Sequence, residues 1–345
     1  MKFIKILLAT VFVGALFVTT YLYFQLKPRS GQSEKILIEV EPGPFKNVID
    51  DLHEKNVIQN KRLFSIIATF TKADQKIKMG EYEITTDMWP HEILTILVSG
   101  KSVQRSFTVQ EGLNIFEIAQ TFELNKITTA KQFLKLVRDP KYTEQLIGFK
   151  ASSLEGYLYP NTYFYTKGMS LDKIIRMMVD HFNNVVSEIA PQLQEDKALR
   201  HKMVILASMI EKETGAPEER PTISSVFYNR MKKNMKFQSD PTIMYGIAVQ
   251  KGFMSNNIRK SDILAKTPYN TYTVPALPIG PIANPGKDAI LAALKPEKTE
   301  YLFFVSMNEG RHYFSRTYQE HDDAVKKYQK DRRMREGKSW RNLKK

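Results

Sequence analysis

The 21 residues from 6 to 26 carry no charge, and basic residues stand on both sides of them. An α-helix needs roughly 20 residues to cross the hydrocarbon core of a bilayer, and a signal peptide has a shorter apolar part. No small-x-small cleavage site follows the stretch. We therefore predict a short N-terminus (residues 1–5), an uncleaved membrane-spanning helix (6–26) and a polar linker (27–36). The flanking basic residues are nearly balanced, so charge alone does not give the orientation.

The remaining chain is long enough for two or three domains, because it has 345 residues in all and 42% of them are apolar. The absence of cysteine excludes a disulfide framework and a thiolate metal site. The six histidines show no H-E-x-x-H spacing, and no G-x-S-x-G or phosphate-binding glycine loop is present. We expect no metal and no cofactor, pyridoxal phosphate included, which leaves carboxylate chemistry.

An internal repeat follows the linker. Residues 38–58 read as a strand, a glycine turn and an amphipathic helix, and residues 107–127 repeat that order 69 residues later. The two copies look like LysM-like α+β units, and we assign residues 37–150 to this module. Two interpretations stay open: a glycan-binding module, as LysM-type units generally are, or a spacer or lid.

A glutamate ends a helical pattern in the second half of the chain. Met203, Leu206 and Ile210 step by three and four along one apolar face, and Glu213 is the next residue on that face. The helix is predicted to stop at Gly215, so Glu213 lies at the negative end of the helix dipole. Burial and this dipole both favour a protonated carboxyl near neutral pH. Such a group can protonate a glycosidic oxygen. The alternative is a helix-end glutamate paired with a lysine or arginine.

Four ordered segments identify the kind of chain. They are E-K-E-T at 211–214 and S-V-F-Y-N-R at 225–230, then F-Q-S-D-P-T at 237–242 with Tyr245-Gly246, and finally T-P-Y-N-T-Y-T at 267–273 with L-P-I-G-P-I-A-N-P-G at 277–286. Together with the anchor and the repeat, these segments resemble the YceG-like family of endolytic murein transglycosylases over nearly the whole chain. The resemblance implies that Glu213 is the catalytic acid. The Glu-Thr pair is also similar to the Glu-Ser of soluble lytic transglycosylases.

The resemblance implies a lyase anchored in the cytoplasmic (inner) membrane, with its body on the extracytoplasmic side. Glu213 would protonate the bond between N-acetylmuramic acid and N-acetylglucosamine in nascent peptidoglycan strands. It would then deprotonate the muramic C6 hydroxyl, which gives a 1,6-anhydro end and sets strand length during wall synthesis. The implied partners are glycan strands, the membrane and cell-wall synthases.

Residues 151–323 form the predicted catalytic domain, a mixed α+β fold with the acid on a helix end. The aromatic stretch 155–165 is expected to line its cleft, and the strand at 301–305 to pair with 312–315 through a turn at 308–310. Five residues are predicted to position the sugar: Gln238, Asp240, Tyr245, Asn270 and Tyr272. Asp240 could be a second acid, but Asp-Pro also commonly starts a turn.

The basic tail, residues 324–345, carries ten Lys or Arg against two acids. It reads first as a solvated helix with a frayed end, and second as a contact for anionic lipid or acidic wall polymer. No groove-reading motif accompanies the charge, so nucleic acid is not an expected partner.

Two other functions fit part of the pattern. A hydrolytic muramidase would use Glu213 with Asp240 activating water. A non-catalytic glycan-binding scaffold of the wall-synthesis machinery would use only the repeat and the anchor.

Overall fold

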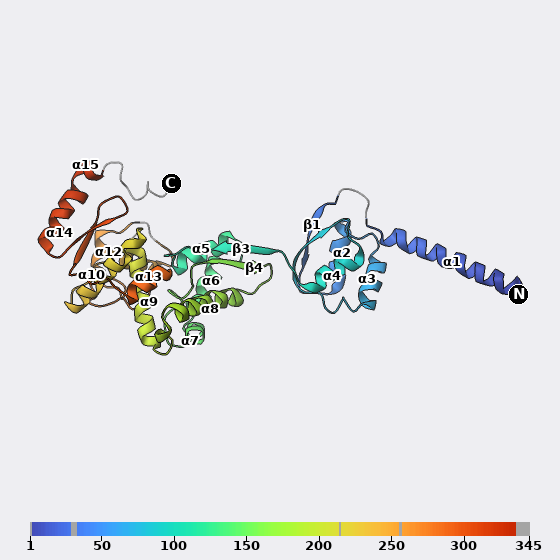
Figure 1. Cartoon of the computed structure of the whole chain (residues 1–345), viewed down its shortest axis with the longest axis horizontal. Coiled ribbons are helices and arrows are strands. Elements are labelled where there is room, and N and C mark those ends of the chain that lie inside the picture. The colour runs from blue at the N-terminus through green and yellow to red at the C-terminus, as the bar shows by residue number, and fades with distance from the viewer. Residues whose placement is uncertain (1, 29–32, 214, 255–256, 336–345) are drawn as a thin grey trace. The chain divides into compact units, whose positions relative to one another are not determined.

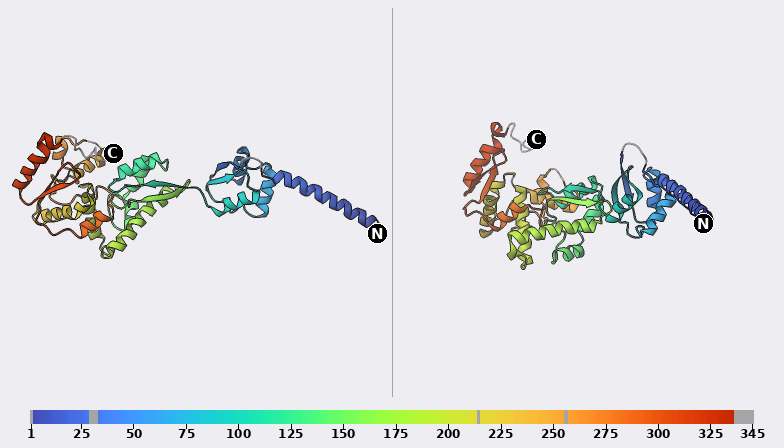
Figure 2. Two further views of the ribbon diagram at one scale, coloured as in Figure 1. Left: turned by 45° about the horizontal axis from the view of Figure 1, so that its top comes forward. Right: turned by 45° about the vertical axis from the view of Figure 1, so that its right-hand side comes forward.

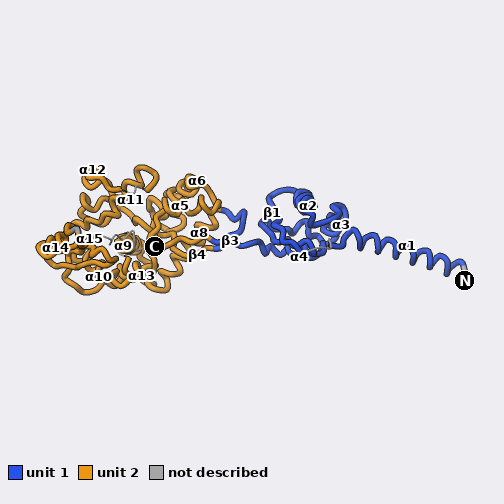
Figure 3. Tube along the Cα trace, turned by 90° about the horizontal axis from the view of Figure 1, so that it is seen from above, with its two compact units in different colours: residues 1–106, 164–170 blue, residues 107–163, 171–345 orange. Residues whose placement is uncertain are grey.

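The computed structural model describes residues 2–28, 33–213, 215–254 and 257–335 (Figure 1). It is a mixed α+β structure, as predicted, with two compact units (Figure 3). Unit 1 comprises residues 1–106 and 164–170, and unit 2 comprises 107–163 and 171–345. The predicted domain boundary at residue 150 therefore lies inside unit 2. Part of the predicted linker (29–32) and the end of the basic tail (336–345) lie outside the described residues.

The first helix, α1 (Lys2–Leu26), covers the uncharged stretch. Its apolar side chains are exposed, and its length and composition suit a membrane span from Phe3 to Leu26. Exposed leucine, valine and phenylalanine along a whole helix are costly in water and favourable in lipid. The structure thus agrees with the predicted anchor.

The rest of unit 1 is a small α+β module. Strand β1 (Lys35–Val40) pairs antiparallel with β2 (Gly80–Thr85), with Ile38 opposite Tyr82. Three helices contribute to its core: α2 (Phe45–Glu54), α3 (Lys61–Phe70) and α4 (Pro90–Ser99). Tyr82 and Ile84 are buried in this core, whereas Glu83 between them is exposed, as the alternation of a strand requires. The first repeat copy thus forms the predicted strand and helix.

The second repeat copy belongs to a different sheet. Strand β3 (Gln104–Thr108) pairs with β4 (Thr162–Thr166), and α5 (Ile115–Leu124) follows β3 within unit 2. Figures 1 and 2 show β3 and β4 side by side where the chain passes between the two units. The two copies share an order of elements, but they do not build one module together.

Unit 2 is mainly helical. A hairpin of β5 (Phe303–Ser306) and β6 (His312–Ser315) confirms the predicted strand pairing. The other helices of this unit, with their bounds, are α6 (Ala130–Val137), α7 (Pro140–Ile147), α8 (Leu171–Ile189), α9 (Lys197–Glu213), α10 (Arg220–Lys232), α11 (Asp240–Lys251), α12 (Lys260–Leu264), α13 (Lys287–Leu294), α14 (Tyr318–Val325) and α15 (Arg332–Arg335), with short turns at Pro191–Leu193, Pro217–Glu219 and Lys326–Lys330.

Helix α9 is enclosed by protein. It packs against α10, α11 and α13, and every residue from 204 to 211 is buried. Leu206 and Ile210 of the predicted apolar face are buried, and neighbouring helices bury the other sides of this part of α9 as well. Gly156 lies against this helix with a φ of +85°, and a Cβ there would come 2.6 Å from Val204 Cγ1. Only glycine combines that conformation with so close an approach.

Most aromatic residues of the stretch 155–165 are buried in the core, whereas Phe164 is 58% exposed. Tyr157 and Tyr163 are buried, and Tyr157 donates to or accepts from His201 Nδ1 at 2.8 Å. The rings of Tyr157 and Phe182 lie 5.0 Å apart, edge to face. Their packing against α8 and α9 supports the helix that carries Glu213.

Candidate active site

Glu213 is the last residue of α9 and is only half-buried. Burial raises the pKa of its carboxyl to about 7, and the nearby charge of Asp240 pushes the pKa in the same direction. The Ser239 hydroxyl and the Arg230 guanidinium oppose that rise. Glu213 forms no ion pair among the residues that the structure describes. A carboxyl in this state can both give and accept a proton near neutral pH.

Asp240 and Tyr272 come next to Glu213 from two separate segments. Asp240 is exposed and opens α11, and its Oδ1 accepts a hydrogen bond of 2.7 Å from the Tyr272 hydroxyl. Burial and this hydrogen bond raise the pKa of the Tyr272 hydroxyl, and the charge of Glu213 adds to the shift. Asp240 and Tyr272, two of the predicted binding residues, thus lie close enough to Glu213 for their charges to affect one another's pKa.

Gln238 stands at the turn before α11. It is exposed, with a φ of +54°, and its backbone N–H donates to the Thr271 carbonyl at 3.3 Å. The next residue, Ser239, donates its N–H to Thr271 Oγ1 at 3.0 Å. The loop 267–273 therefore holds the backbone of residues 238–239 in place beside Glu213.

Asn270 shapes that loop from within. It is 1% exposed, and its amide donates to the carbonyls of Ala265 at 2.7 Å and Ile263 at 3.0 Å. Its Oδ1 accepts from the Tyr272 N–H at 2.9 Å. The structure thus places Asn270 beneath Tyr272 as a support and gives it no exposed polar atom for a sugar.

Tyr245 is also buried, and its hydroxyl hydrogen-bonds to Glu155. Burial raises the pKa of the Glu155 carboxyl to about 8. This carboxyl also accepts from the Ile115 N–H and from Asn284 Nδ2, both at 2.9 Å. Tyr245 consequently belongs to an internal network at the start of α5, and the structure does not bring it to the surface with Gln238, Asp240 and Tyr272.

Arg230 is a member of the site that the sequence prediction did not select. It is 7% exposed and donates to the carbonyls of Phe237 at 2.6 Å, Lys236 at 3.1 Å and Leu302 at 2.6 Å. It thereby fixes the turn that leads to Ser239, and its charge acts on Glu213. A signal was present: Ile223, Phe227 and Arg230 step by four and three on α10, so a charge stands where a core residue is expected.

Glu211, and not Glu213, forms an ion pair with an arginine, which was the alternative interpretation of Glu213. Its Oε1 lies 2.8 Å from Arg220 Nη2, and both side chains are buried. Its Oε2 accepts from the Gly286 N–H at 3.0 Å. Glu211 therefore joins α9 to the start of α10 through a salt bridge and to the start of α13 through a hydrogen bond.

The described residues contain no cluster of three or more His, Asp or Glu side chains that could hold a metal ion. The site thus offers one half-buried carboxyl, a second exposed carboxylate held by a tyrosine, and a buried guanidinium. This set suits proton transfer to and from a neutral substrate oxygen.

Comparison with known proteins gives one consistent result. The family model described as the YceG-like family matches residues 38–327. An endolytic murein transglycosylase of Bacillus subtilis (strain 168) is 32% identical over 307 residues, covering 84% of this chain and 84% of the relative. One of Streptococcus pneumoniae serotype 2 is 27% identical over 353 aligned positions, covering 93% of this chain and 63% of the relative.

A crystal structure of a YceG-like protein from Listeria monocytogenes is similar as well. It has a TM-score of 0.58 and 32% sequence identity, and the match covers 85% of this chain and 100% of that one. At this identity the likeness extends to sequence as well as fold.

Proposed function

Because this chain belongs to the YceG-like family, we propose that it is a lyase, a lytic transglycosylase of peptidoglycan, with Glu213 as its catalytic acid. The names of the curated relatives support the activity, and the alignment with the Bacillus subtilis enzyme covers 84% of each chain. One observation carries the assignment of the acid: Glu213 is half-buried, without an ion pair in the described chain, with a pKa of about 7.

The proposed reaction uses that pKa twice. Protonated Glu213 gives its proton to the oxygen between N-acetylmuramic acid and N-acetylglucosamine, and the bond from C1 to that oxygen breaks. The resulting carboxylate then takes the proton of the muramic C6 hydroxyl, whose oxygen attacks C1 to close a 1,6-anhydro ring. Glu213 is protonated again at the end, so one carboxyl serves as acid and then as base. No water is consumed.

Asp240 has a supporting part in this proposal. Its negative charge raises the pKa of Glu213, which favours the protonated form needed for the first step. Tyr272 fixes the Asp240 carboxylate through the 2.7 Å hydrogen bond. We propose that Asp240, Tyr272 and the exposed Gln238 contact the glycan, while Asn270 and Tyr245 support the surrounding loops.

Helix α1 completes the proposal as a membrane anchor with the body of the protein on the extracytoplasmic side. A tether of this kind raises the effective concentration of the enzyme at newly made strands. We propose that cleavage there sets strand length during wall synthesis and that the enzyme works beside cell-wall synthases.

Mass analysis of cleaved glycan strands tests the reaction. The full chain in detergent should release fragments with 1,6-anhydro-muramic ends, and Glu213→Gln should lose about 10²–10⁴-fold in rate, the usual contribution of a general acid. Reducing ends would instead show a hydrolytic muramidase, in which the exposed Asp240 activates water. Unchanged cleavage by a folded Glu213→Gln protein would remove Glu213 from the mechanism.

A further inference from the structure

Helix α3 of unit 1 presents large apolar side chains to solvent. Ile66 is 62% exposed and Phe70 is 89% exposed, and the two lie one turn apart on the same face. The opposite face, with Phe64 and Ala68, is buried in the module core. Helix α3 is thus apolar on two sides, and the module core accounts for only one of them.

Basic residues flank this face of α3. Residues 61–73 contain Lys61, Arg62 and Lys72 and no acidic residue. Lys61 is paired with Asp50 at 2.7 Å, whereas Arg62 and Lys72 are exposed and form no ion pair within the described chain. Apolar side chains flanked by basic ones are typical of helices that lie in the interface of an anionic bilayer.

The start of α3 is tied to the end of α1. Asn60, the N-cap of α3, donates from Nδ2 to Gln25 Oε1 at 2.9 Å, and Gln59 Nε2 donates to the Lys27 carbonyl at 2.9 Å. The Tyr23 ring lies 5.8 Å from that of Trp89. Tyrosine and tryptophan are enriched at the membrane–water interface.

These contacts place α3 at headgroup level if α1 spans the bilayer. A helix of residues 6–26 is about 32 Å long at 1.5 Å per residue, which matches a hydrocarbon core of roughly 30 Å. Gln25 and Lys27 then reach the lipid headgroups. Figures 1 and 2 show α3 beside the end of α1 and running across its direction, so α3 does not lead away from the membrane.

We propose that the outer face of α3, formed by Arg62, Ile66, Phe70 and Lys72, docks on the extracytoplasmic leaflet of the membrane. Ile66 and Phe70 enter the boundary between headgroups and acyl chains, and Arg62 and Lys72 contact anionic phospholipid. This inference rests on the proposed anchoring by α1. The module is then held at the bilayer at two places, and its swing about the end of α1 is restricted.

Single-cysteine labelling tests the docking directly, because the native chain has no cysteine. The full chain carries an environment-sensitive fluorophore at Ile66→Cys or Phe70→Cys and is reconstituted into vesicles of phosphatidylcholine with phosphatidylglycerol. Quenchers attached near the top of the lipid acyl chains should remove roughly half of the fluorescence, since an interfacial helix enters about 5–10 Å. Aqueous iodide should quench the same labels poorly.

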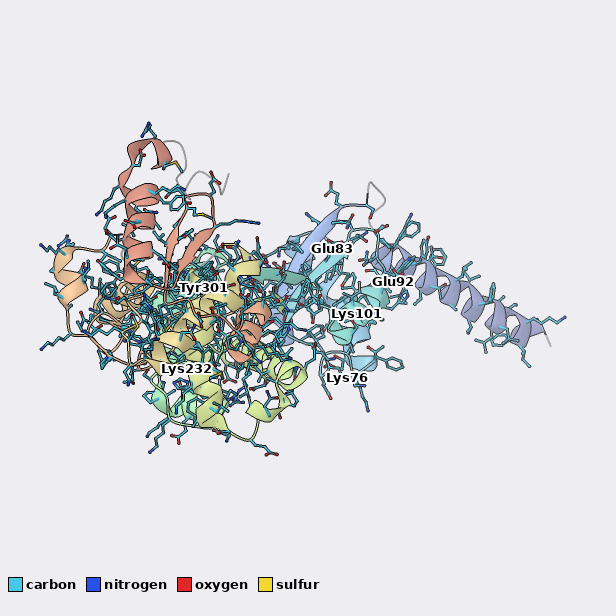
Figure 4. All side chains as sticks on the ribbon, turned by 60° about the vertical axis from the view of Figure 1, so that its left-hand side comes forward. Lys76, Glu83, Glu92, Lys101, Lys232 and Tyr301 are labelled. Atoms are coloured by element: carbon cyan, nitrogen blue, oxygen red, sulfur yellow. The ribbon has the colours of Figure 1, made fainter. Side chains whose placement is uncertain are left out.

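Two other positions serve as controls. Glu83→Cys lies on the outer face of the β1–β2 sheet, within unit 1 (Figure 4), and its label should respond to iodide and not to the lipid quencher. Its exposed salt bridge with Lys35 contributes little to stability. Leu16→Cys in α1 reports the anchor itself and should be quenched only by probes deep in the bilayer.

The outcomes separate docking from anchoring. If the labels at 66 and 70 behave like that at 83 while the label at 16 is quenched by lipid, the docking is wrong and the anchor stands. If the label at 16 is not quenched by lipid, the anchor is wrong and the docking fails with it. Shielding of positions 66 and 70 from both quenchers would show a protein partner and overturn the lipid assignment.

A second experiment tests the electrostatic part of the docking. Exchanging Arg62 and Lys72 for Gln, or omitting phosphatidylglycerol, should reduce the lipid quenching at Phe70→Cys at least about twofold, because each basic residue near the surface favours anionic lipid. Quenching that ignores both changes would contradict the electrostatic part of the docking.

Discussion

Replacing Glu213 with Gln should stabilise the protein in a strongly pH-dependent way. In the unfolded chain this carboxyl ionises near its ordinary pKa of 4.5, whereas burial delays ionisation in the folded state to about 7. Between these two values the folded protein holds a proton that the unfolded chain has lost. Stability contributed by the protonated group is therefore complete below about pH 4.5 and is lost as the pH rises to about 7.

The size of the effect follows from the two pKa values. Each pH unit between 4.5 and about 7 corresponds to about 1.36 kcal/mol, so the full difference is about 3.4 kcal/mol. Glu213 is only half-buried, and contact with solvent reduces that figure. We expect Glu213→Gln to gain about 2–3 kcal/mol in unfolding free energy at pH 8 and close to nothing at pH 4, because the amide is neutral at both.

Thermal melts of the full chain in detergent, followed by circular dichroism, measure this difference. A gain of that size should raise Tm by roughly 4–12 °C at pH 8 in a unit as large as unit 2. The matched control is Glu211→Gln on the same helix. It should destabilise by about 3–5 kcal/mol at pH 8, because it leaves Arg220 buried without its partner.

Two results would refute the reasoning. A Glu213→Gln protein that melts at or below the wild-type temperature at pH 8 would mean that the carboxylate is already well solvated or paired. An equal gain at pH 4 and pH 8 would mean that the amide stabilises by packing, without any link to ionisation. The opposite signs expected for positions 211 and 213 make a general effect of Gln on this helix easy to recognise.

Three further predictions concern activity. Arg230→Met should raise the pKa of Glu213 further, so the alkaline limb of the kcat/KM profile should move to higher pH; an unmoved limb would show that the guanidinium only supports the fold. Tyr272→Phe removes a hydrogen bond to the Asp240 carboxylate, and we expect roughly tenfold slower cleavage with unchanged Tm, so full activity would count against this pair. Deleting residues 1–27 should leave cleavage of isolated strands intact but impair an exported form in cells, and complete complementation would argue against tethering.

Composition and short-range pattern predicted the features that depend on neighbours in the chain. The long apolar helix α1 follows from an uncharged run, and the β5–β6 hairpin from two apolar strands around a turn containing Gly310. The position of Glu213 at a helix end follows from the stop at Gly215 and from the family segments. None of these features depends on which residues from distant parts of the chain enclose an element.

The different environments of Glu211 and Glu213, by contrast, depend on residues from distant parts of the chain. Periodicity placed Glu213 on the buried face, yet Glu211 is the more deeply buried carboxylate, because Arg220 and the Gly286 N–H come from other elements to satisfy it. Tyr245 is a similar case. Its partner Glu155 is 90 positions earlier in the chain, and no local pattern distinguishes a tyrosine bonded inside a core from one that stacks on a sugar.

The close contact between Gly156 and α9 has a consequence for how activity can be lost. Helix α9 is a stiff rod, and Val204, which touches Gly156, lies nine residues before Glu213, about 13 Å along the axis. A methyl group at 156 would push against α9 near its middle and tilt the helix. The C-terminal end of α9, which carries Glu213, would move most. A shift of about 1 Å at a reacting group can cost 10²-fold in rate. Alanine at this remote glycine would thus displace the carboxyl of Glu213, the proposed acid. A screen for inactive variants would recover this substitution together with substitutions at the site itself.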